Sequence, residues 1–94
     1  MSAIILHTIS VGDDPVFVAR KQYVACVQAT SWTDLTVNLF QSADKTDANS
    51  WVGVGGDLTA DNAIVSLKGG LYLKATKTGV GTGTVTIRVT EVVV

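Results

Sequence analysis

The chain has 94 residues, of which 47% are hydrophobic and only 16% charged, and its formal net charge at pH 7 is -1. Its seven basic and eight acidic residues are spread along the sequence and form no basic stripe that could neutralise phosphates, so we expect no nucleic-acid partner. Soluble domains average about 25% charged residues, and the apolar excess predicts that another subunit or a neighbouring protein covers part of the surface. An ordinary β-sandwich with apolar strands is the alternative.

The first residues, MSAIILHTISVGDD, indicate no secretory signal, because the apolar patch spans only Ala3–Leu6 and no basic residue precedes it. No run approaches the roughly 18 apolar residues of a membrane span, so we expect no membrane partner. Cys26 is the only cysteine, which rules out a disulfide framework and a zinc cluster and is compatible with a reducing compartment. We interpret Cys26 as a small core residue of its strand.

The first half of the chain is predicted to form strands separated by polar turns. Turn signals are Gly12–Pro15, Thr30–Asp34 and the polar segment Gln41–Ser50, which we expect to be an exposed loop. The segment 1–12 is either a strand or an N-terminal arm. The expected strands are Ala3–Ile9, Val16–Val18, Tyr23–Ala29 and Leu35–Leu39.

The second half centres on the stretch Trp51–Ala75. Glycines at 53, 55 and 56 are expected to bend or interrupt a strand. Ala63–Leu67 and Leu71–Ala75 flank Lys68, Gly69 and Gly70, which predicts a β-hairpin with glycine at a position of positive φ. After a turn at Lys77–Gly83, Thr84–Val94 is the last strand, and its apolar end should be paired centrally or buried by a partner.

No segment shows helical periodicity between caps, and strands recur with turn signals between them. The fold class is therefore all-β: an antiparallel β-sandwich or small barrel, of jelly-roll or Ig-like type, with seven or eight strands. Residues 1–94 are interpreted as a single domain.

Residues for catalysis or cofactor binding are sparse. His7 is the only histidine and is expected to be structural, and no pair of carboxylates stands out. The carboxylates of Gln41–Ser50 do not follow the spacing of a calcium loop, and the glycines before Asp57 do not form a phosphate loop. We therefore predict no enzyme activity, no metal and no cofactor.

Aromatic residues are the remaining candidates for contact. We expect Trp51 and Phe40 to close the core and Trp32 to cap its open end. A stacking platform for a sugar is the alternative use of the six aromatic residues Phe17, Tyr23, Trp32, Phe40, Trp51 and Tyr72. Tyr72, which alternation turns outward beside Lys74, is the best candidate for a surface contact.

Four segments follow one another between Leu35 and Val92: LTVNLFQSAD, SWVGVGGDLTADNAIVSL, GGLYLKATKTG and TVTIRVTEV. They include a tryptophan, the G-x-Y-x-(K/R)-A-x-x-x-G pattern of Gly70–Gly79 and a Thr/Val-rich last strand. Together these segments resemble the small decoration or cement proteins of tailed-phage capsids.

The resemblance implies a structural virion protein, made in the host cytoplasm, that lies on the capsid surface and stabilises the head by binding between capsomers. Its implied partners are further copies of itself, as a homotrimer, and a major capsid protein. The candidate interface residues are Ile4, Ile5, Leu6, Tyr72, Val92, Val93 and Val94. Two alternatives remain open: a carbohydrate- or receptor-binding module, with solvent-facing Trp32 or Trp51 in place of buried tryptophans, and a fibre, tail or connector subunit.

Overall fold

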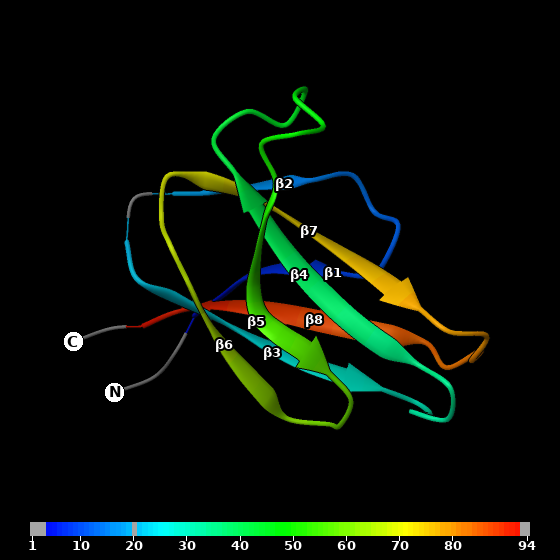
Figure 1. Ribbon diagram of the computed structural model, residues 1–94. Helices are drawn as coiled ribbons and strands as arrows, with labels where there is room; N and C mark the ends of the chain where they lie inside the picture. Colours follow the sequence, from blue (N-terminus) through cyan, green and yellow to red (C-terminus); the bar gives the residue numbers. More distant parts are fainter. Residues whose placement is uncertain (1–3, 20, 93–94) are drawn as a thin grey trace.

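The computed structural model describes residues 4–19 and 21–92, and for residues 4–6 it describes the backbone alone. These residues form eight strands and no helix, and the strands build two four-stranded antiparallel sheets that pack together (Figure 1). The all-β sandwich expected from the sequence is confirmed. The strands are β1 (Ile4–Ile9), β2 (Val16–Val18), β3 (Tyr23–Ala29), β4 (Thr36–Ser42), β5 (Val52–Leu58), β6 (Ala63–Leu67), β7 (Leu71–Thr78) and β8 (Val85–Glu91).

One sheet has the order β1-β8-β3-β6 and the other β2-β7-β4-β5. Every connection except β4–β5 therefore carries the chain from one sheet to the other, and β8 lies between β1 and β3, far from both in sequence (Figure 1). Central pairing of the last strand is confirmed for Val85–Glu91, whereas Val93 and Val94 of its expected apolar end lie outside the described residues. In the part of the chain that the structure describes, nothing forms a helix that could cross a membrane.

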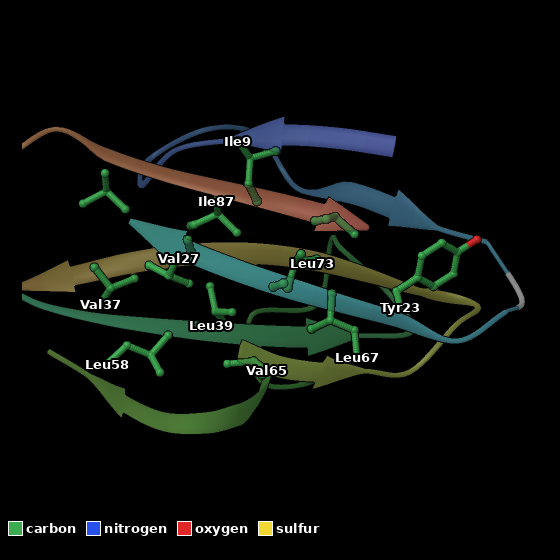
Figure 2. Close-up of a cluster of buried hydrophobic side chains, with 14 of the residues drawn as sticks. Ile9, Tyr23, Val27, Val37, Leu39, Leu58, Val65, Leu67, Leu73 and Ile87 are labelled. Carbon is green, nitrogen blue, oxygen red and sulfur yellow. The ribbon is translucent and has the colours of Figure 1, made fainter. Parts of the chain in front are cut away.

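The core lies between the two sheets and follows the alternation of the strands (Figure 2). In β4, Val37 and Leu39 are fully buried, and in β8 the same holds for Ile87 and Val89, while their sequence neighbours are only half-buried. Alternation arises because successive side chains of a strand point to opposite faces. The largest fully buried side chains are Leu39, Leu73, Ile87, Val18, Val27, Val37, Val85 and Val89.

The predicted hairpin across Lys68–Gly70 is wrong. β6 pairs with β3 in one sheet and β7 pairs with β2 and β4 in the other, so this turn carries the chain from sheet to sheet. Gly70 does have the expected positive φ, 82°, and its N–H donates to the Val18 carbonyl. A short glycine turn suits a crossover as well as a hairpin, and the pairing partners are non-local.

Gln41 fixes this crossover from the neighbouring strand. Its side chain is buried, donates to the Lys68 carbonyl at 2.8 Å and accepts from the Lys68 N–H at 2.9 Å. Gln41 and Ser42 therefore belong to β4, and the polar loop predicted over Gln41–Ser50 begins only at Ala43. Polarity alone suggested a loop because a buried glutamine that serves the backbone resembles an exposed one in sequence.

The glycines of β5 create a bulge, as the sequence predicted. Val37 pairs with Leu58 and Leu39 with Val54, so the single residue Asn38 faces three residues of β5. Gly55 and Gly56 have φ values of 80° and 67°, and a Cβ on Gly55 would overlap the Val65 side chain. The bulge interrupts an exposed sheet edge, which protects it from pairing with other chains.

Candidate binding face

The outer surface of the sheet β2-β7-β4-β5 gathers four of the six aromatic side chains. Tyr72 lies between the core-directed positions of β7, and Phe40 lies between buried Leu39 and Gln41 on β4, so alternation turns both away from the core. We call this surface the aromatic face. It consists of Phe17, Phe40, Trp51 and Tyr72 together with Lys45 and Lys74.

Strand pairing brings these residues together from distant parts of the sequence. Phe17 of β2 is directly opposite Tyr72 of β7, and Lys74 is opposite Phe40 of β4. The Phe17 and Tyr72 rings meet edge to face, with centroids 5.3 Å apart and planes inclined by 67°. Such a geometry is favourable for aromatic pairs. Phe17 nevertheless leaves 51% of its surface exposed.

Two lysines lie over the rings. Lys74 Nζ is 4.3 Å from the centroid of the Trp51 ring and 5.9 Å from that of Phe40. Lys45 Nζ is 5.5 Å from the centroid of Tyr72. All three distances are within the range of cation–π attraction, which contributes about 0.5–1 kcal/mol at exposed sites. The face therefore combines aromatic surface with two positively charged lysines that lie over its rings.

The loop between β4 and β5 positions Lys45. Ser42 Oγ donates to the Asp44 carbonyl, and the Ser50 hydroxyl donates to the Asp47 carbonyl at 2.8 Å. The Thr46 hydroxyl and then the Thr46 N–H donate to Asp44 and hold the pKa of that carboxyl below its ordinary value. Asp44 is thus engaged within its own turn.

Among the described side chains, neither Lys45 nor Lys74 lies within ion-pair distance of a carboxylate. The one ion pair of these side chains joins Lys21, in the loop between β2 and β3, to Glu91 of β8, with 3.2 Å between nitrogen and oxygen. The aromatic face can therefore attract an anionic group next to apolar surface.

The expected core positions of Phe40, Trp51 and Cys26 are wrong, whereas the expected position of Trp32 agrees with the structure. Phe40 and Trp51 do not close the core; they lie on the aromatic face. Cys26 is not a core residue, because buried Ala25 and Val27 occupy the inner positions of β3 and leave Cys26 half-buried on the outside. Trp32 packs against the core while half-buried, as expected of a cap.

Trp32 is anchored by Asp61. The indole Nε1–H donates to Asp61 Oδ1 at 2.6 Å, and the same oxygen accepts the Ala29 N–H at 2.9 Å. The Ala29 bond first, and the indole second, lower the pKa of Asp61 below its ordinary value. Beside Trp32 an open hollow of about 560 Å³ includes Asp34 and Val80 in its wall. Among the described residues of that wall, Asp34 is the one titratable side chain.

The predicted interface residues are only partly placed. Tyr72 is on the aromatic face, as the sequence predicted. Val92 is 39% exposed and its N–H donates to the Gln22 carbonyl. The backbones of Ile4 and Ile5 pair with β8, and Leu6 lies in β1 where the register shifts. The side chains of Ile4, Ile5 and Leu6, and all of Val93 and Val94, lie outside the described residues.

His7 is half-buried, and its Nε2 lies 3.2 Å from the Phe17 carbonyl oxygen, a contact between the first strands of the two sheets. Within residues 4–19 and 21–92, no three His, Cys, Asp or Glu side chains are grouped so that they could hold a metal ion.

Sequence reasoning found Tyr72 and Lys74 but missed their neighbours. The alternation of Asn38 and Phe40 with Val37 and Leu39 was the available signal for Phe40. Comparison with models of known protein families, with curated proteins and with solved structures gave no match.

Proposed function

We propose that this chain is a structural protein of a tailed-phage virion, a decoration or cement protein that binds between capsomers on the capsid surface. The observation that carries the proposal is the aromatic face, a continuous outer surface of one sheet on which four aromatic rings are available for contact. Aromatic residues are enriched at protein interfaces. The resemblance of Leu35–Val92 to such proteins, noted from the sequence, is what suggests the virion context.

In this proposal the protein acts by contact and not by catalysis. Burial of apolar surface contributes about 25 cal/mol per Å², so covering the aromatic face against the shell favours the bound state. Each bound copy stabilises the assembled shell over its separated subunits by mass action. The terminal apolar segments Ile4–Leu6 and Val92–Val94 are proposed to add to these contacts.

Binding to empty shells assembled from the major capsid protein of the same virus tests the proposal. We expect the protein to co-sediment with the shells at a fixed ratio of copies per capsomer and to raise their melting temperature. Substitution of Phe17 by Ser should weaken binding, whereas substitution of Ile64, exposed on β6 of the other sheet, should not. Shells that neither bind the protein nor gain stability would contradict the proposal.

A second candidate is a carbohydrate-binding module, favoured by the position of Trp51 on an outer face. Aromatic rings can pack on the apolar faces of sugars, and Trp51 would report such stacking. Lys74 Nζ already lies over one face of this ring, and a sugar on that face would have to displace it. Titration with oligosaccharides, followed by tryptophan fluorescence, would favour the module if emission changed saturably in wild type but not in Trp51→Leu.

A further inference from the structure

The charges of the aromatic face restrict the kind of surface that can cover it. Lys45 and Lys74 reach it from the β4–β5 loop and from β7, and each lies over an aromatic ring. In the described part of the chain, no carboxylate is within ion-pair distance of either lysine. A partner that buried these ammonium groups without compensating charge would incur their desolvation cost. The surface that covers them must therefore supply negatively charged hydrogen-bond acceptors, such as carboxylates.

A second copy bound through the same face does not meet this requirement. A two-fold contact joins the same patch of both copies, so it would bring four lysines into one interface, and the residues of the aromatic face include no carboxylate to compensate them. Like charges opposed across an interface are unfavourable by several kcal/mol. The face thus fits a different surface, with carboxylates set among apolar side chains.

The size of the face is suited to a protein partner. The molecule measures 36 × 35 × 19 Å along its principal axes, so a sheet surface can provide the roughly 800 Å² per partner that a stable interface buries. The rings of Phe17 and Tyr72 lie at one side of this face, and those of Phe40 and Trp51 lie around Lys74. Apolar and positive features are therefore distributed over the same surface.

We propose that the aromatic face binds an acidic protein surface in which Asp or Glu side chains pair with Lys45 and Lys74 while apolar side chains cover the rings. This inference rests on the proposed function, in which that surface belongs to the capsid shell. The lysines give the contact its orientation and its dependence on salt. The rings supply the apolar contact area.

Methionine substitutions separate charge from packing, since methionine keeps an unbranched apolar stem. Binding of wild type, Lys45→Met and Lys74→Met to the shells would be measured at low and high salt. We expect each substitution to raise the Kd about tenfold or more and to weaken its salt dependence. Lys21→Met, which removes a lysine from the loop between β2 and β3 that pairs with Glu91, is the control and should change the Kd less than twofold.

Carbodiimide coupling, which joins a lysine amine directly to a touching carboxylate, identifies the partner groups. We expect cross-links from Lys45 or Lys74 to Asp or Glu of the capsid protein.

Equal or tighter binding of Lys74→Met, or cross-links only through other lysines, would overturn the inference while leaving the shell as partner. Binding lost after periodate oxidation of shell sugars, without such cross-links, would place a glycan on the face and also overturn it. Wild type that fails to bind shells would overturn the proposed function itself.

Discussion

Asp61 ties three parts of the chain together with one carboxylate oxygen. It accepts the Ala29 N–H and the Trp32 indole N–H, and these bonds favour the charged form and lower the pKa in the folded state. Since the unfolded chain retains the ordinary pKa near 4, the stabilisation is complete above that pH and is lost as pH falls through the lower, folded-state pKa. Asp61 thus makes a small contribution to the acid sensitivity of the fold.

We predict that Asp61→Asn flattens the acid dependence of stability. The amide oxygen can still accept hydrogen bonds but does not titrate, so the stability difference between wild type and variant should shrink as pH falls below about 4. Urea unfolding between pH 7 and pH 3, followed by tryptophan fluorescence, measures this difference. Asp44 also has a lowered pKa, but it is present in both proteins and cancels. Parallel curves at all pH values would contradict the assignment.

Alanine substitutions at Gly79 and Gly12 distinguish the cost of steric overlap from the cost of backbone strain alone. Both have positive φ, 94° and 83°, but a Cβ on Gly79 would overlap the Asp34 carbonyl, whereas a Cβ on Gly12 would meet nothing within 4 Å. Gly12→Ala should therefore cost only the strain of a left-handed alanine, about 1 kcal/mol. Gly79→Ala should cost about 3 kcal/mol or more in the free energy of unfolding by urea. Equal losses would show that the turn at Gly79 relaxes freely.

At the scale of elements, the crossover from β6 to β7 depends on Gln41. Gln41→Leu would preserve the approximate volume of the side chain but leave the Lys68 N–H and carbonyl without their partners. We expect a loss of about 2 kcal/mol in the free energy of unfolding, measured by urea denaturation. Gln22→Leu, whose side chain is exposed, is the control and should stay within about 0.5 kcal/mol of wild type. If the Gln41 variant were as stable as the control, water would be satisfying the Lys68 N–H and carbonyl in place of the Gln41 side chain.

The strands themselves were largely predictable, but their partners were not. Alternation in Leu35–Leu39 and in Val85–Val89 predicted which side chains are buried, because the buried residues recur at every second position. In Tyr23–Ala29 the buried face was not predicted, and Cys26 was wrongly expected in the core. Alternation could not tell that Ala63–Leu67 pairs with β3 and not with β7. Turn chemistry at Gly70 is local, whereas the sheet to which a strand belongs is decided by contacts with distant segments.

The candidate site shows the same limit. The outward direction of Tyr72 and Lys74 follows from the sequence, but their neighbours depend on the strand order β2-β7-β4. That order brings Phe17 to Tyr72 and Phe40 to Lys74. Trp51 precedes its strand, so no alternation indicated its direction, and its contact with Lys74 appears only in three dimensions.

At the scale of the whole molecule, the proposed cement role implies a closed oligomer, most simply a homotrimer. Lysines on the aromatic face disfavour two-fold pairing there, so we expect the copies to meet through other surfaces. Light scattering after size exclusion should give three times the chain mass of 9.8 kDa. The Lys74→Met variant should give the same trimer mass, because the copies are expected to meet through other surfaces. A monomer at high concentration would contradict the oligomer and favour a monomeric decoration protein or a ligand-binding module.

The central position of β8 has a consequence for synthesis in the cell. β8 joins β1 to β3, so their sheet stays divided until residues 85–91 have left the ribosome. Before then β3 can pair only with β6, and its other edge is free to meet neighbouring chains. Such long-range pairing also slows folding. Newly made chains are therefore vulnerable to misassociation until this strand has emerged and paired.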